Sequence, residues 1–523
     1  MCRDESGRSG LERGWELRTR LRSSPTYFEH SPNNPPILEL LSILGTTVGA
    51  SGSRERPPRS REPTMKSINP ATEEVIETHE EHDEATVDAR LDAAWDRFGS
   101  WRETPISRRE KLLASAADVL RENSEEYASL MTEEMGKPVE QAVSEVEKCA
   151  WVCDYYAEHA SEFLQDEHIG TVPGSKTYVS YEPIGPVLAV MPWNFPFWQV
   201  FRFAAPHITA GNVAVLKHAP NVFGCADAIA SVFERAGYPD DVFTSLRIPA
   251  ERVAGVIEDD RVRGVSLTGS TRAGRAVAET SGRELKPTVL ELGGSDPFVV
   301  LDDAPLEATA KQAAQARTQN NGQSCIAAKR FLVHEAVYDE FVERFTEEMR
   351  ALTVGDPTDP ETDVGPQARA DLMETLHEQV TASVEAGATL RLGGEPLDRP
   401  GHYYPPTVLT GVPEDAPART EELFGPVATV IEVEDVAEAV RVANDTPYGL
   451  GASVWTADAE RGEALTTNLT AGNVAVNHVV ASDPRVPFSG TKDSGYGTEL
   501  SRHGIREFVN TKTVWVEDAP ADE

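Results

Sequence analysis

A chain of 523 residues is too long for a single hydrophobic core, so two or three domains are expected. Hydrophobic residues make up 40% of the sequence, which is enough for packed cores. No uncharged apolar run reaches the roughly 18 residues that suggest a membrane span. The cysteines fit neither a disulfide framework nor a metal-binding spacing, which predicts free thiols, a cytoplasmic setting and no bound metal; they are Cys2, Cys149, Cys153, Cys225 and Cys325.

The net charge of −37 is distributed unevenly along the chain. Residues 1–64 hold ten Arg, no Lys and eight acidic residues, a net of +2, whereas the rest holds 39 basic and 78 acidic residues, a net of −39. Only 11 of the 49 basic residues are Lys. Such an acidic, Lys-poor composition is typical of proteins that work in molar salt, and it disfavours nucleic acid as a partner. A cationic partner is a weaker alternative, because the acidic residues are spread along the whole chain.

Residues 1–64 differ in composition from the rest of the chain. They are rich in Arg, Ser, Pro and Gly and lack the ordered plan of a signal peptide, which predicts a disordered extension. The segment that begins at Met65 resembles a natural protein start. We therefore hypothesise that residues 1–64 come from an upstream start site and are not native. A transit-like segment is the alternative, weakened by the eight acidic residues.

The hydrophobic pattern of the following residues predicts helices first and then alternating strands and helices. The pattern is mostly helical from Glu84 to Ser161, and it changes to strand and turn near Thr177. The alternation that follows predicts a doubly wound parallel sheet, and a second alternating stretch runs from Pro297 to about Asn477. The elements of the first stretch are strand 187–191, helix 197–210, strand 213–217, helix 222–236, strand 242–243, helix 250–258, strand 262–267 and a helix from Thr271.

Two features at predicted strand ends favour a phosphate-bearing ligand. Gly269 and Ser270 connect a strand to a helix, where small residues let an anion approach the helix N-terminus. This segment has neither the dinucleotide nor the Walker glycine pattern, so a purely structural turn is equally compatible. Lys217 ends another strand of the same sheet, where ligands of parallel sheets bind, and can donate to ribose hydroxyls or to a 2′-phosphate. The alternative is an ordinary surface lysine.

Cys325 and Glu291 each lie in a glycine-containing turn, 34 positions apart (325 − 291). A thiolate is a strong nucleophile, and a carboxylate can take a proton from a thiol or from water. Alone, such a pair is more often a buried cysteine and a surface glutamate. Asn194, which is held between Trp193 and Phe195, adds an amide that can donate to a developing oxyanion, although a turn-forming asparagine is the alternative.

These segments, in this order, resemble the NAD(P)-dependent aldehyde dehydrogenase superfamily from about Met65 to Trp515. Further matches are segments 421–426 (EELFGP) and 487–495 (PFSGTKDSG). The resemblance implies an α/β fold with a Rossmann-like parallel-sheet cofactor domain, an α/β catalytic domain and a small β oligomerisation element. It also implies oxidation of an aldehyde to a carboxylic acid with NAD or NADP, through a thiohemiacetal and a thioester.

We expect three parts and an extension. The NAD(P)-binding domain comprises 65–165 and 184–292, the catalytic domain 293–487, and the bridging strands 166–183 and 500–517. In the family, such strands extend a neighbour's sheet, so a homodimer or homotetramer is expected.

The resemblance also implies roles for single residues. Cys325 would be the nucleophile and Glu291 the general base, while Asn194 and the Cys325 backbone N–H would form the oxyanion hole. Glu499 matches a family position linked to proton relay. The residues implied for the cofactor are Lys217 and Glu422 at the riboses, Trp193, Gly269 and Ser270 along the cleft, and Phe424 near the nicotinamide.

The segments around the site are most similar to the branch that acts on succinate semialdehyde. Arg202, eight positions after Asn194, matches a family position that grips a distal carboxylate, and an Arg in a structural ion pair is an equal alternative. Trp198 and Ser482 are further candidate substrate contacts. The sequence departs from the better-known pattern where a second Arg would lie: position 319 is Gln, and Arg317 is two positions away.

The cofactor preference is left open between NAD and NADP. An acid three residues after Lys217 commonly favours NAD by repelling a 2′-phosphate, but this chain has Pro220 there, so NADP should be tolerated. Another aliphatic or aromatic aldehyde and a CoA-acylating reaction are alternatives; Glu291 argues against the latter. A non-catalytic protein on this fold would be expected to lose Cys325 or Glu291, and a thiol hydrolase would usually pair its cysteine with His.

Overall fold

The computed structural model describes residues 64–170 and 175–517. Of the predicted extension 1–64, only Thr64 falls inside these ranges, as the first residue of strand β1. The predictions of a disordered extension and of an upstream start site therefore concern residues outside the described part of the chain.

The described chain begins with a two-stranded antiparallel sheet followed by four helices. Helix α1 starts where the Asp83 carboxylate accepts a hydrogen bond of 2.8 Å from the Thr86 N–H, a side-chain cap that satisfies a free helix-end donor. The helical pattern predicted from Glu84 to Ser161 is confirmed. The elements are β1 Thr64–Ile68, β2 Val75–Glu80, α1 Glu84–Trp101, α2 Ile106–Glu122, α3 Ser124–Met135 and α4 Val139–Phe163.

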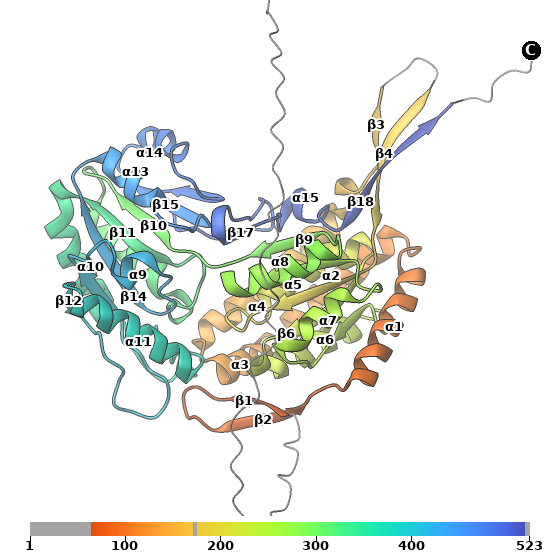
Figure 1. Ribbon diagram of the computed structural model, residues 1–523, viewed down its shortest axis with the longest axis horizontal. Coiled ribbons are helices and arrows are strands. Elements are labelled where there is room, and N and C mark those ends of the chain that lie inside the picture. The colour runs from red at the N-terminus through yellow and green to blue at the C-terminus, as the bar shows by residue number, and fades with distance from the viewer. Residues whose placement is uncertain (1–63, 171–174, 518–523) are drawn as a thin grey trace, which may run out of the picture. The chain divides into compact units, whose positions relative to one another are not determined.

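A six-stranded sheet follows, in the order β17-β9-β8-β5-β6-β7. Its strands are parallel except β17, which pairs antiparallel with β9. Strands β5 and β6 are almost wholly buried, as expected when helices cover both faces of a parallel sheet (Figure 1). The elements are β5 Pro186–Met191, α5 Trp198–Ala210, β6 Val213–His218, α6 Phe223–Arg235, β7 Phe243–Ser245, α7 Val253–Glu258, β8 Gly264–Thr268, α8 Thr271–Arg283, β9 Thr288–Glu291 and β17 Gly495–Tyr496.

A seven-stranded sheet has the order β12-β13-β14-β11-β10-β15-β16, and only β12 and β13 pair antiparallel. Both alternating stretches predicted from the sequence thus form mainly parallel sheets. The elements are β10 Asp296–Val300, α9 Leu306–Thr318, β11 Ala328–His334, α10 Tyr338–Ala351, α11 Ala370–Glu385, β12 Thr389–Leu392, β13 Thr407–Thr410, α12 Pro417–Thr420, β14 Val427–Val433, α13 Val436–Asn444, β15 Gly451–Trp455, α14 Ala459–Thr466 and β16 Asn473–Val476.

Three further strands form a separate small sheet that stands clear of the two larger ones (Figure 1). They are β3 Glu167–Ile169, β4 Lys176–Pro183 and β18 Val509–Val516. The predicted bridging segment 500–517 is therefore a strand only in its second half, because α15 (Ser501–Gly504) occupies part of the first half. The domain boundaries remain predictions.

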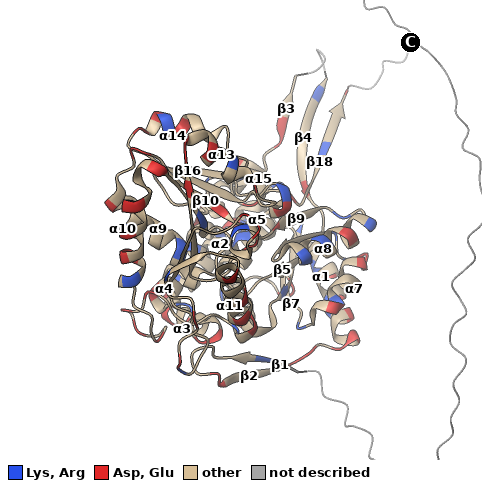
Figure 2. Ribbon diagram, turned by 60° about the vertical axis from the view of Figure 1, so that its left-hand side comes forward, with Lys and Arg blue, Asp and Glu red and all other residues tan. Residues whose placement is uncertain are grey.

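Acidic residues recur along the outer helices of the described chain (Figure 2). Short 3₁₀ helices connect some of the elements: η1 Pro220–Val222, η2 Ala250–Arg252, η3 Gln319–Gly322, η4 Glu335–Val337 and η5 Lys492–Ser494. Within 64–170 and 175–517, no helix combines the length and the apolar character needed to cross a membrane.

Candidate active site

Glu291 lies at the carboxyl end of β9, the edge at which parallel sheets bind ligands. In the sheet it is the register partner of Thr268 on β8 and of Gly495 on β17. Its carbonyl oxygen accepts a hydrogen bond of 3.0 Å from the Gly269 N–H. The predicted base and the predicted phosphate-binding turn are therefore neighbours.

The glycine pair after Glu291 lies directly against the turn that carries Cys325. A Cβ atom added to Gly294 would lie only 2.7 Å from the Cys325 carbonyl oxygen, so no side chain fits there. The segment 291–294 and Cys325, far apart in sequence, thus meet in the fold.

The turn before Cys325 has an unusual backbone conformation. Asn320, Asn321 and Gly322 all have positive φ, at 54°, 57° and 73°. Asparagine tolerates this left-handed region better than most residues, and glycine adopts it freely. A side chain at Gly322 would also collide with the Gly425 backbone. The residue types of this turn are therefore those that the conformation requires.

Hydrogen bonds from several elements hold this turn. The Asn321 amide donates to the carbonyls of Gly136, at 2.8 Å, and Pro366, at 2.9 Å. The fully buried Arg317 donates to the Gly322 carbonyl at 2.6 Å. These contacts fix the turn rigidly in front of Cys325.

Asn194 is buried against the same turn. Its side-chain amide donates to the Gln323 backbone carbonyl at 3.1 Å, and its backbone carbonyl accepts from the Asn320 side-chain amide at 2.7 Å. An asparagine amide has two N–H donors, so one remains for another acceptor. The position of Asn194 next to the Cys325 turn is compatible with the predicted oxyanion role.

The Cys325 thiol is partly buried, and burial raises its pKa to about 12. The positive charges of Lys329 and Arg202 act in the opposite direction, while Glu422 and Glu291 act in the same direction as burial. Lys329 donates to the Cys325 carbonyl at 2.7 Å. In the protein without ligands the nucleophile is therefore held mainly as the neutral thiol.

Glu291 and Glu499 are both buried carboxyl groups, and burial raises the pKa of each. Glu499 forms an ion pair with Arg202, which also donates to the Thr268 hydroxyl at 3.2 Å. No described residue hydrogen-bonds to the Glu291 carboxyl oxygens. A carboxyl group with a raised pKa is a stronger base once ionised, which suits general-base work.

Arg202 has the ion-pair role that the sequence left as an alternative to carboxylate binding. It is buried against Glu499, and its guanidinium also lies 5.1 Å from the centre of the Phe488 ring. It still faces the cavity described below. The charge of Arg202 is therefore largely neutralised by the Glu499 carboxylate.

The residues implied for the cofactor lie at the carboxyl ends of β6 and β8. Lys217 is buried, burial lowers its pKa to about 8, and it has no hydrogen bond or ion pair to a described residue. Ser270 caps helix α8 by accepting from the Ala273 N–H at 3.3 Å. A Cβ atom at Gly269 would meet only Leu267, at 3.8 Å. A buried cation that forms no hydrogen bond or ion pair and feels only the charge of nearby Glu251, together with open space before a helix N-terminus, fits the phosphate and ribose groups of a dinucleotide.

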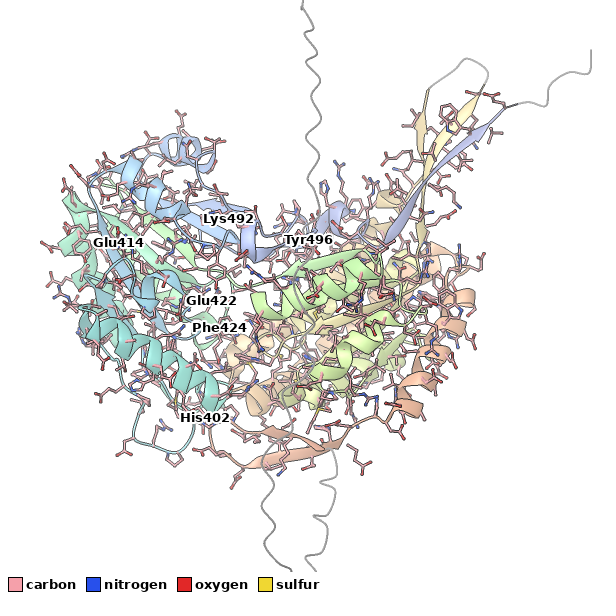
Figure 3. The ribbon with its side chains drawn as sticks, viewed as in Figure 1. His402, Glu414, Glu422, Phe424, Lys492 and Tyr496 are labelled. Atoms are coloured by element: carbon pink, nitrogen blue, oxygen red, sulfur yellow. The ribbon has the colours of Figure 1, made fainter. Side chains whose placement is uncertain are left out.

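Three more of these residues lie at the junction with the seven-stranded sheet. The Glu422 carboxylate accepts from the Gly294 N–H at 3.0 Å and lies 3.4 Å from the Lys329 ammonium. Trp193 and Phe424 pack edge to face, with ring centres 5.8 Å apart. Figure 3 shows Glu422 and Phe424 close together on the segment after α12.

A cavity of about 590 Å³ opens next to Cys325. Its wall brings together Cys325 and the predicted substrate contacts Arg202, Trp198 and Ser482. Asn194, Glu291 and the predicted cofactor residues are not part of this wall. Gln319 lines the cavity, whereas Arg317 donates its hydrogen bonds to backbone carbonyls and does not.

Several polar residues of this wall were not among the residues predicted from the sequence. Helix α4 contributes Gln141, Ser144, Glu145 and Lys148, which have the i, i+3, i+4, i+7 spacing of one helix face. Lys148 donates to the Ser482 hydroxyl at 2.8 Å. The polar stripe was visible in the sequence, but only the fold shows that it lines a cavity.

The raised pKa of Cys325 predicts its alkylation behaviour. Because only the thiolate reacts, the second-order rate of iodoacetamide labelling should rise about tenfold per pH unit between pH 7 and 9.5, without a plateau. Labelling is measured by mass spectrometry of the Cys325 peptide, with Cys325→Ala as the background control. A plateau near pH 8 would contradict the assignment of a raised pKa.

Comparisons with known proteins agree with this geometry. Residues 58–514 match the model of the Aldehyde dehydrogenase family. The chain is 51% identical over 452 residues to a probable succinate-semialdehyde dehydrogenase [NADP(+)] of Synechocystis sp., covering 86% of this chain and 99% of the relative. It is 49% identical over 455 residues to a succinate-semialdehyde dehydrogenase [NADP(+)] of Mycobacterium avium, covering 86% and 96%. The solved structure of succinic semialdehyde dehydrogenase from Streptococcus pyogenes in complex with NADP+ has a TM-score of 0.85 and 38% identity, covering 87% of this chain and 100% of that one. The chain therefore belongs to the aldehyde dehydrogenase family.

Proposed function

We propose that this protein oxidises succinate semialdehyde to succinate, with NADP+ as the preferred cofactor and NAD+ as an acceptable one. The observation that carries the proposal is the cavity that combines the Cys325 thiol with the ammonium of Lys148 and with Arg202, whose charge is largely compensated by Glu499. A nucleophile and positive charge in one cavity suit an aldehyde that carries a distal carboxylate. The names of the relatives support the same substrate and cofactor.

The residues of the chain divide the reaction between them. The Cys325 thiolate adds to the aldehyde carbon, and the Asn194 amide and the Cys325 backbone N–H donate to the resulting oxyanion. Oxidation at this carbon would need a hydride acceptor, which is the chemistry that a bound nicotinamide would supply. Glu291 then deprotonates the water that hydrolyses the Cys325 thioester, and Glu499 relays the proton away.

Glu291 also favours hydrolysis over transfer of the acyl group to CoA. A CoA-acylating enzyme has no need of a buried base beside its thioester, and burial raises the pKa of this carboxyl group as such a base requires. A non-catalytic protein on the same fold would not need the supported left-handed turn before Cys325.

The dinucleotide would be held by Lys217, Glu422, Trp193, Ser270, Gly269 and Phe424. Pro220 leaves no acid three residues after Lys217, so a 2′-phosphate meets the buried Lys217 ammonium without a nearby repelling carboxylate at that position. The NADP(+) in the names of the relatives supports this preference.

The setting in which the protein works is also inferred. The cysteines in the described ranges are free thiols, which supports a reducing, cytoplasmic location. The net charge of −37 and the small number of lysines support function in molar salt.

We also infer a homodimer or homotetramer. Large apolar side chains of the small sheet are exposed: Ile169 at 46%, Trp515 at 58% and Val516 at 48%. A second copy would cover them. Native mass spectrometry in volatile salt tests this, and a mass of a single subunit at micromolar concentration would contradict it.

The function is tested by following the absorbance of the reduced cofactor in molar KCl. Succinate semialdehyde is compared with butyraldehyde, each with NADP+ and NAD+. We expect kcat/KM at least about tenfold higher for the semialdehyde, because a hydrogen-bonded charge contributes about 1.5–3 kcal/mol, and a higher value with NADP+.

The control is Cys325→Ala, which should lose all cofactor reduction. Equal efficiency with butyraldehyde would discard the substrate proposal while leaving aldehyde oxidation in place. Reduction that does not depend on Cys325 would contradict the mechanism.

A further inference from the structure

Lys148 occupies a distinctive position in the cavity wall. It projects from helix α4, and its ammonium group lies 4.3 Å from the centre of the Trp198 ring. It donates to the Ser482 hydroxyl at 2.8 Å. An aromatic ring and a hydroxyl from two other segments thus hold the ammonium in place at the cavity.

The other buried cations of the wall already have acidic partners. Lys137 forms a buried ion pair with Glu145, whose carboxylate also accepts from the backbone N–H groups of Phe197 and Trp198. Arg202 is paired with Glu499. Among the described residues, Lys148 forms no ion pair, although it is partly buried.

The remaining charged residues of the wall do not neutralise Lys148. Asp363 is exposed, and its carboxylate accepts from the Thr353 N–H at 2.8 Å. Lys311 is exposed as well, and Glu348 is only partly buried. The positive charge that lacks a partner inside the cavity is therefore that of Lys148.

We propose that Lys148, together with the Ser482 hydroxyl, binds the distal carboxylate of the substrate, in the role that a second arginine would have at position 319. This inference rests on the proposed function. An anion that enters the cavity can form an ion pair with the ammonium of Lys148 without breaking an existing ion pair. Binding to Arg202, in contrast, would compete with Glu499. Lys148 would thus be the residue that distinguishes a semialdehyde from an uncharged aldehyde.

The protonation of Lys148 gives the proposal a pH signature. Burial, and after it the charge of Arg202, lower its pKa to about 8 against the opposing effects of Cys149, Glu145 and Asp483. Only the ammonium form binds a carboxylate, so binding is strongest below pH 8 and weakens as the pH rises above it. Of these neighbours, Cys149 stays neutral because burial raises its pKa, and Asp483 stays ionised because Arg485 lowers its pKa.

The test is the ratio of kcat/KM for succinate semialdehyde to kcat/KM for butyraldehyde, measured from pH 6.5 to 9.5. The ratio cancels the titration of Cys325 and Glu291, which act on both substrates. In the wild type it should fall above pH 8. Lys148→Met should lower the ratio about tenfold or more at pH 7 and remove its pH dependence.

Two further variants separate charge from packing. Lys148→Arg keeps the charge and should retain most of the wild-type ratio. Lys111→Met removes the same charge from the exposed surface of α2 and should leave the ratio within about twofold. The rate with butyraldehyde shows that each variant is folded.

The outcomes distinguish a failure of the Lys148 proposal from a failure of the proposed substrate. A ratio that Lys148→Met leaves unchanged, in an enzyme that prefers succinate semialdehyde, would overturn the role of Lys148 alone. A wild-type ratio near or below one would overturn the proposed substrate. Succinate as an inhibitor of butyraldehyde oxidation gives an independent check: its inhibition constant should rise about tenfold in Lys148→Met, and an unchanged constant would overturn the carboxylate site.

Discussion

The active site depends on one backbone constraint, the three consecutive left-handed residues before Cys325. Such a turn is unfavourable in isolation and persists only where the surroundings determine it. Here the support comes from Asn321, which bonds to Gly136 and Pro366, and from Arg317, which bonds to Gly322. These partners belong to different parts of the chain: Gly136 is the C-cap of helix α3, Arg317 lies on α9, and Pro366 precedes α11. The turn is therefore held by contacts between segments that are far apart in sequence.

Charge is the second constraint, since two buried carboxyl groups are close to a single guanidinium. Arg202 pairs with Glu499, and no described residue hydrogen-bonds to the Glu291 carboxyl oxygens. Two neighbouring carboxylates in a poorly hydrated site resist ionising together, so the pKa of Glu291 is raised by burial and by Glu499. The arrangement gives Glu499 a charged partner and leaves the Glu291 carboxyl group without a hydrogen bond to a described residue, which is compatible with the proposed role of Glu291 as a base.

The sequence predicted the parallel sheets and the helical character of residues 84–161, because hydrophobic periodicity is a local feature. That distant segments meet around Cys325 was implied only by the family resemblance of their motifs. It could not distinguish the two roles open to Arg202, since the ion-pair partner Glu499 lies almost three hundred positions away. The contact between Lys148 and Ser482 was hidden for the same reason: it joins residues 334 positions apart. Arg317 lies two positions from the place of the second arginine, and only its burial and its bonds to backbone carbonyls show that it supports the turn.

The proposed role of Glu291, which is to deprotonate the water that hydrolyses a thioester on Cys325, is tested by single-turnover kinetics of Glu291→Gln. Glutamine keeps the size of the side chain but cannot take a proton from water. If Glu291 is the base, the variant should give a rapid burst of about one reduced cofactor per Cys325, almost no further turnover, and a succinyl group on the Cys325 peptide by mass spectrometry. Continued turnover at the wild-type rate, without an acylated peptide, would contradict it.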